Sequence, residues 1–147
     1  MISYSYNDIF YVCSLIEFIA RKSKNKRGVV VMALGESGIR KQLDDAPVNH
    51  CLSFEQVSDE IMEFYHIPNG DFDTITGSRF SIPSYTAIGG LYSLLVKEIS
   101  PPGHEIATIF NLFKSFLSDR ISNFSSDLYY QNPSYLVESY KAGKLLD

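Results

Sequence analysis

The stretch Val48–Ile67, VNHCLSFEQVSDEIMEFYHI, holds the clearest helix start in the chain. Ser53 precedes Gln56 by three residues, the spacing of a capping box, in which two side chains satisfy backbone N–H groups at a helix N-terminus. Apolar residues then recur at helical spacing. The sequence therefore predicts an amphipathic helix that begins after Ser53. Its apolar positions are Phe54, Val57, Ile61, Phe64 and Tyr65.

Two groups of residues are candidates for binding a partner protein. Glu55, Asp59 and Glu63 recur every four residues along the predicted helix, which is typical of a solvated face and equally of an acidic docking strip. Near the end of the chain, tyrosines gather, and tyrosine is enriched at protein interfaces. These tyrosines also fit the role of clamping the last helix onto the core. The candidates there are Tyr129, Tyr130 and Tyr135.

Upstream, an apolar stripe over residues 9–20 predicts a first helix with Asn7 as its N-cap. Five cations follow within seven residues, where this helix should end. They fit a favourable interaction with the helix dipole plus a solvated linker, or an electrostatic contact with nucleic acid or an acidic protein. The five cations are Arg21, Lys22, Lys24, Lys26 and Arg27.

The segment Gly28–Leu34, GVVVMAL, is interpreted as a helix that Gly35 ends. A short helix over residues 36–43 should follow. Asp44, Asp45 and Pro47 should break it, because proline disfavours the α conformation of the residue before it.

Turn-forming residues in the connection 66–82 mark a boundary between two helical halves, 1–66 and 67–147, which are expected to pack on each other as one compact unit. We expect either that Phe72, Ile75 and Phe80 order this long loop by packing or that the loop has a binding role. Helices are predicted from about 85 to 99, from 104 to 123, and from Asn132-Pro133 to Gly143. Gly89 and Gly90 inside the first of them indicate that another backbone lies close. The fold class is all-α, an irregular bundle of about seven helices.

Composition is that of an ordinary globular protein: 147 residues, 45% hydrophobic, 20% charged, with a net charge of −4. Cys13 and Cys51 lie among apolar neighbours, which indicates buried, reduced cysteines. Neither a secretory signal nor an apolar run of membrane-spanning length is present. We therefore expect a soluble, cytoplasmic protein without membrane contact.

Catalytic and metal-binding motifs are absent. His50, Cys51 and His66 gather possible metal ligands, but their spacing matches no zinc motif, so they are interpreted as turn or core residues. The segment GESG at residues 35–38 lacks the spacing of a nucleophile elbow. No phosphate-binding glycine motif occurs, and neither a cofactor nor a metal is expected.

Residues 9–65, with FYVCSLIEFIARKS and VNHCLSFEQVSDEI, resemble a small uncharacterised bacterial domain family. Members are often encoded beside ADP-ribosyltransferase-like toxins, which implies a neutralising or accessory role. The stretches RFSIPSYTAIGGLYSLL and FLSDRISNFSSDLYYQNPSYLVESYKAG are similar to hypothetical proteins of Gram-positive gut bacteria, for which no activity is assigned.

Three functional hypotheses follow. The leading one is a non-enzymatic bacterial interaction protein, the antitoxin-like or accessory partner of a toxin, and it combines the missing catalytic motifs with the resemblance. The second is a DNA-binding regulator that uses residues 28–43 as a helix-turn-helix. The third is an enzyme with an unrecognised helical active site.

Overall fold

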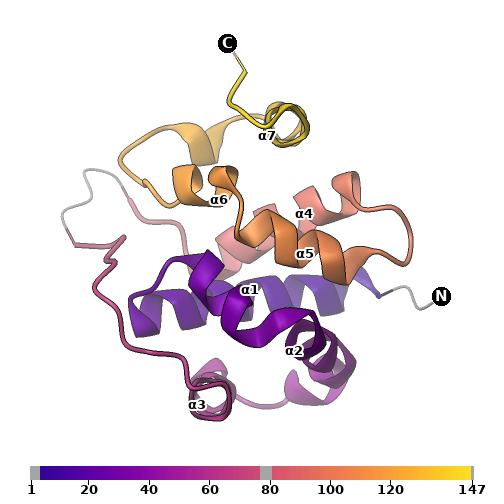
Figure 1. The fold of residues 1–147 in the computed structure, drawn as a ribbon, viewed down its shortest axis with the longest axis vertical. Helices are drawn as coiled ribbons and strands as arrows, with labels where there is room; N and C mark the ends of the chain where they lie inside the picture. The colour runs from indigo at the N-terminus through magenta and orange to yellow at the C-terminus, as the bar shows by residue number, and fades with distance from the viewer. Residues whose placement is uncertain (1–3, 77–80, 147) are drawn as a thin grey trace.

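The computed structural model describes residues 4–76 and 81–146, and within these ranges the chain is all-α (Figure 1). The described part contains seven α-helices, one turn of 3-10 helix and no strand, which confirms the predicted fold class. None of its helices combines the length and apolar character that a membrane span requires. The elements are α1 (Tyr6–Ser23), α2 (Arg27–Asn49), α3 (Phe54–Phe64), α4 (Tyr85–Ile99), α5 (Glu105–Phe113), α6 (Phe116–Ile121), η1 (Leu128–Tyr130) and α7 (Pro133–Ala142).

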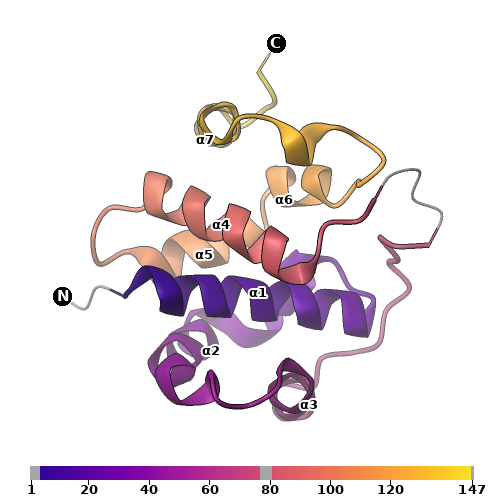
Figure 2. The same cartoon turned by 180° about the vertical axis from the view of Figure 1, so that it is seen from behind.

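Helix α1 lies in the middle of the molecule, between α4 on one side and α2 and α3 on the other (Figure 2). Its most extensive helix contact is with α4, so the contact crosses the boundary predicted near residue 66. Buried apolar side chains from Ile9 to Val137 form one continuous cluster. Both predicted halves therefore share a single core.

A glycine allows α1 and α4 to approach closely, as the sequence predicted. A Cβ atom on Gly89 would lie 1.9 Å from Oγ and 2.8 Å from Cα of Ser14. A Cβ on Gly90 would instead meet only the ring of Phe10, at 3.5 Å. Of the two glycines, the packing therefore requires Gly89 alone.

Of the three predicted N-caps, two are confirmed and one is wrong. The Ser53 hydroxyl accepts a hydrogen bond from the N–H of Gln56 at 3.1 Å, and Asn132 caps α7 ahead of Pro133. Asn7 is not the cap of α1. Ser5 takes that role, because its hydroxyl accepts the N–H of Asp8 at 3.2 Å.

Two breaks were predicted in the segment that forms α2, and only the first is observed. Gly35 has φ at +67° and interrupts the helix, as predicted. Positive φ is easily adopted only by a residue without a side chain. The helix then continues to Asn49 through Pro47, although Asp44, Asp45 and Pro47 were predicted to end it near residue 43. Burial of Leu43 and Ala46 in the core stabilises this last part against the local effect of proline.

The single helix predicted over residues 104–123 is two helices, α5 and α6, with a break at Lys114-Ser115. The Ser115 hydroxyl donates to the carbonyl of Leu112 at 2.7 Å and replaces part of the helical hydrogen bonding. The change of direction lets both Phe113 and Leu117 point into the core, where each is fully buried.

The connection before α4 is held against the end of α1. The N–H groups of Gly70 and Phe72 donate to the carbonyls of Ser23 and Lys24 at 2.8 and 2.9 Å. Phe72 is half-buried, whereas Ile75 is 45% exposed and does not order the loop by burial as predicted. The third predicted anchor, Phe80, lies outside the described residues.

Candidate functional site

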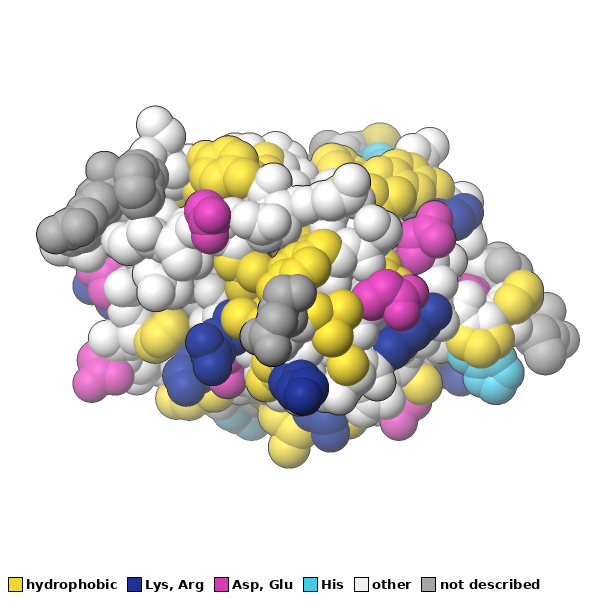
Figure 3. Space-filling model, turned by 90° about the horizontal axis from the view of Figure 1, so that it is seen from above, with side chains coloured by type: hydrophobic (Ala, Val, Ile, Leu, Met, Phe, Trp, Pro, Cys, Tyr) yellow, Lys and Arg dark blue, Asp and Glu magenta, His cyan; other side chains and the backbone are white. Residues whose placement is uncertain are grey.

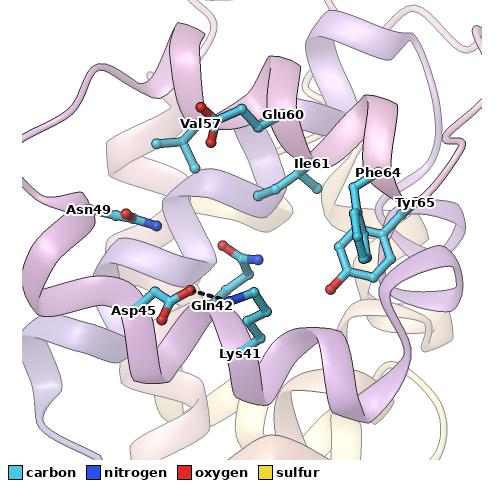
Figure 4. Close-up of a pocket in the computed structure, with 9 residues that line it drawn as sticks. All are labelled: Lys41, Gln42, Asp45, Asn49, Val57, Glu60, Ile61, Phe64 and Tyr65. Carbon is cyan, nitrogen blue, oxygen red and sulfur yellow. Dashed lines mark hydrogen bonds and ion pairs between the residues drawn. The ribbon is translucent and has the colours of Figure 1, made fainter.

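A groove of about 280 Å³ lies between helix α3 and the second segment of α2, residues 36–49 after the break at Gly35 (Figure 4). Two features described above create it: the Ser53 cap that starts α3, and the continuation of α2 through Pro47 to Asn49. The sequence analysis predicted that the helix ends near residue 43, so it did not predict that residues 44–49 would line one side of a groove.

The floor of the groove is apolar, and one end carries an exposed aromatic ring. Val57 and Ile61 are 2% and 4% exposed. Phe64 is 72% exposed, which corrects its predicted place on the inward stripe of α3. Tyr65 packs on Gly38, where an added Cβ would lie 3.2 Å from the tyrosine ring, and its hydroxyl points toward the groove (Figure 4). These residues form an apolar surface that an apolar side chain of a binding partner could contact.

Gln42 is the least expected member of the groove. Its side chain is 5% exposed and points into the groove (Figure 4), yet within residues 4–76 and 81–146 its amide has no hydrogen-bond partner. A carboxamide can donate two hydrogen bonds and accept two. Gln42 is therefore a largely buried side chain whose amide reaches the groove with unused hydrogen-bonding capacity; among the described residues, only Ser14 Oγ is both fully enclosed and without a partner.

Acidic groups predominate around the groove. Lys41 Nζ lies 2.9 Å from Asp45 Oδ2, so this cation is already neutralised (Figure 4). Glu60 is exposed at the rim, and no cation of the described chain forms an ion pair with it. The rim is thus negatively charged above an apolar floor.

The predicted acidic strip on α3 is exposed, and part of it is paired. Lys22 of α1 bonds Glu55 at 2.6 Å and also bonds Asp59. Burial acts to lower the pKa of Lys22, but the hydrogen bonds to Asp59 and Glu55 raise it above its ordinary value. Glu63 forms no ion pair in the described chain. One predicted nucleic-acid contact is thus a partner of two predicted protein-binding residues.

Two further members of the predicted basic segment point inward, not to solvent. Arg27 is 3% exposed, and its Nε lies 2.6 Å from Glu17 Oε1 in the core. Arg21 binds the second oxygen of Glu17 at 2.8 Å and the carbonyl of Pro83 at 2.6 Å. Both guanidinium groups are thus used within the fold.

Arg27 makes further hydrogen bonds that join three helices. One terminal nitrogen donates to the hydroxyls of Tyr92 and Ser122, at 3.2 and 2.7 Å, and to the carbonyl of Ser118 at 2.9 Å. Burial alone would lower the pKa of Arg27, but Tyr92 and Glu17 raise it, so the guanidinium stays charged. Periodicity could not reveal this role, because Arg27 lies among exposed cations in sequence.

The remaining two predicted cations, Lys24 and Lys26, are exposed. Lys24 has φ at +56° and ends α1, and Lys26 lies 5.7 Å above the ring of Phe72. Two exposed lysines therefore remain of the five cations proposed to contact phosphates.

The tyrosine cluster lies at the opposite end of the molecule from α3. Figure 3 views this end, where hydrophobic side chains form a central patch flanked by lysine and arginine. Tyr130 is 65% exposed and packs edge-on against Tyr129, whose pKa is raised by burial. A cleft of about 560 Å³ opens beside Tyr135, but the hydroxyl of Tyr135 donates to the carbonyl of Leu146 at 2.7 Å. The hydroxyl of Tyr135 is thus used within the chain.

The turn at His50 and Cys51 has a packing role. His50 stacks on Tyr11 with 4.8 Å between ring centroids, and Cys51 is exposed, which corrects its predicted burial. Across the described residues, no three His, Cys, Asp or Glu side chains are placed together to hold a metal.

Comparisons with known proteins add no relative: no protein-family model matches the chain, and no curated protein or solved structure is significantly similar to it. The site must therefore be interpreted from its own geometry.

Proposed function

We propose that this protein is a non-enzymatic interaction protein that binds a partner protein on the side formed by α3 and the second segment of α2. The observation that carries the proposal is the pairing of an acidic exposed surface with an apolar groove that has an exposed Phe64 at its end. Apolar anchors surrounded by charge are typical of protein-binding sites.

The toxin partner implied by the family resemblance stays a prediction. The DNA-binding hypothesis draws less support than protein binding, because Arg21 and Arg27 bind Glu17 and Lys22 binds the acidic face of α3. A surface that attracts phosphates needs cations free to approach them.

Charge reversal at the groove tests the proposal. Because Lys22 holds Asp59, the cleaner exchange is Glu60→Lys with Glu63→Lys, two exposed carboxylates without an ion pair in the described chain. The tagged protein and the double variant would be used to capture partners from cells of the source organism, with quantitative mass spectrometry as the readout. We expect one discrete protein to be retained by the wild type and reduced by about tenfold in the variant.

The control is Glu98→Lys with Glu138→Lys, the same change of charge on exposed positions of α4 and α7. Glu138 lies 4.0 Å from Lys141 Nζ, and such an exposed pair contributes little to stability. It should retain the partner. Equal capture by both double variants, or recovery of this protein alone from wild-type cells, would refute the proposal. Thermal unfolding of each variant verifies that the fold is intact.

A further inference from the structure

The groove between α2 and α3 contains a polar group that the fold itself does not use. Gln42 is only 5% exposed, has no hydrogen-bond partner among the described residues, and points into the groove (Figure 4). The amide atoms are not fully enclosed, so in the free protein they meet solvent in the groove. A bound group that displaces solvent from the groove must both donate and accept hydrogen bonds to keep this amide satisfied.

The dimensions of the groove indicate what kind of group enters it. Its volume of about 280 Å³ lies just below the range of typical small-molecule pockets, about 300–1,000 Å³. It is open to solvent and floored by Val57 and Ile61, with the ring of Phe64 at one end. It therefore suits one apolar side chain of a polypeptide, whose backbone supplies the N–H and C=O groups that match Gln42.

Charge at the rim indicates what flanks this side chain. Lys41 is paired with Asp45, whereas Glu60 lies at the rim without an ion pair in the described chain. Glu63 adds a second unpaired carboxylate on the same helix. A cation beside the inserted side chain would meet these carboxylates, and an anion would be repelled.

We propose that the α2–α3 groove binds a partner segment in which an apolar side chain is flanked by lysine or arginine, with the Gln42 amide hydrogen-bonded to the segment's backbone. This inference rests on the proposed function and specifies its partner. The mode is anchor-residue recognition, in which pockets give specificity and backbone hydrogen bonds give affinity.

The experiment uses three synthetic peptides, each acetylated and amidated: Lys-Lys-Leu-Lys-Lys, the same peptide with leucine changed to serine, and Glu-Glu-Leu-Glu-Glu. Each would be titrated to millimolar concentration into the ¹⁵N-labelled full chain. The first should shift the side-chain amide resonances of Gln42 and the backbone resonances of Ile61 and Tyr65. The serine and acidic peptides should bind at least about tenfold more weakly.

Gln42→Leu should weaken binding of the basic apolar peptide by about threefold to tenfold, the effect of one neutral hydrogen bond. Equal binding of the three peptides, shifts located away from the groove, or an unchanged affinity of Gln42→Leu would each overturn the inference. So would groove shifts that appear only as the protein's own concentration rises, since the occupant would then be a second copy.

The outcomes separate this inference from the proposed function. If the peptides leave the groove resonances unchanged while capture of a partner still depends on Glu60 and Glu63, the groove assignment alone is wrong. If capture is also independent of these carboxylates, the proposed function is wrong as well.

Discussion

Arg27 and Gln42 are both polar side chains enclosed on α2, and the protein treats them in opposite ways. Arg27, at the start of the helix, donates hydrogen bonds to Glu17, to Tyr92 and to serines of α6 and its C-terminal end. The side-chain amide of Gln42, in the second segment of the helix, forms no hydrogen bond with any described residue. Burial of the two is nearly equal, at 3% and 5% exposed.

The difference separates a structural polar group from a candidate binding group. A buried charge must be paired and hydrogen-bonded, because its desolvation is otherwise very unfavourable. An uncharged amide at the wall of an open groove can stay unpaired at a smaller cost. The comparison thus predicts that substitutions at the two positions change different properties of the protein.

The largest expected effect is that of Arg27→Met. The substitution leaves Glu17 in the core with only Arg21 as its ion-pair partner, and breaking a buried pair typically lowers the free energy of unfolding by about 3–5 kcal/mol. Urea denaturation followed by circular dichroism measures this loss. A variant that does not fold at all would have lost more free energy of unfolding than the wild type possesses.

The control combines Arg27→Met with Glu17→Met. It should be less destabilised than the sum of the two single variants, because no isolated charge then remains in the core. A loss below about 1 kcal/mol for Arg27→Met alone would contradict the structural role of this cluster.

The next effect in size tests the packing of the same region. Gly89→Ala should lower the free energy of unfolding by about 1–3 kcal/mol, because its Cβ would overlap Ser14. Gly90→Ala is the matched control, with its nearest neighbour at 3.5 Å, and should stabilise α4 by about 0.5–1 kcal/mol. Thermal unfolding of both variants compares their stabilities. Equal changes in stability would mean that α1 and α4 do not approach most closely at Gly89.

The smallest effect on stability is expected at the groove. Gln42→Leu removes no hydrogen bond within the described chain, so its free energy of unfolding should stay within about 0.5 kcal/mol of the wild type or rise. Urea denaturation in parallel with Arg27→Met measures it. A loss above about 1 kcal/mol would mean that the amide is bonded within the folded protein, which would make the two polar groups alike.

Features of the fold that depend on neighbouring residues were predictable from the sequence. The cap at Ser53 and the Asn132-Pro133 start of α7 follow from local chemistry. The close approach at Gly89 follows from the cost of a glycine inside a helix, although its partner Ser14 was not predicted. Each depends on a few residues and on backbone geometry, which single sequences record well.

Features that depend on packing between distant segments were not predictable. Burial of Leu43 and Ala46 stabilises the continuation of α2 through Pro47. The break at Ser115 lets Phe113 and Leu117 both point into the core. The acidic face of α3 was predictable, but the groove beside it required the position of α2. Gln42 itself gave no signal, because glutamine is common on exposed helix faces.

The meeting of Ser14 and Gly89 also constrains how the protein forms on the ribosome. Residues 14 and 89 are far apart in the chain, and α1 packs more extensively on α4 than on its own neighbours in sequence. Chains emerge with the N-terminal part first. The apolar side of α1 that α4 covers therefore stays exposed until more than half of the chain has been synthesised, which makes α4 the step that commits the nascent protein to its core.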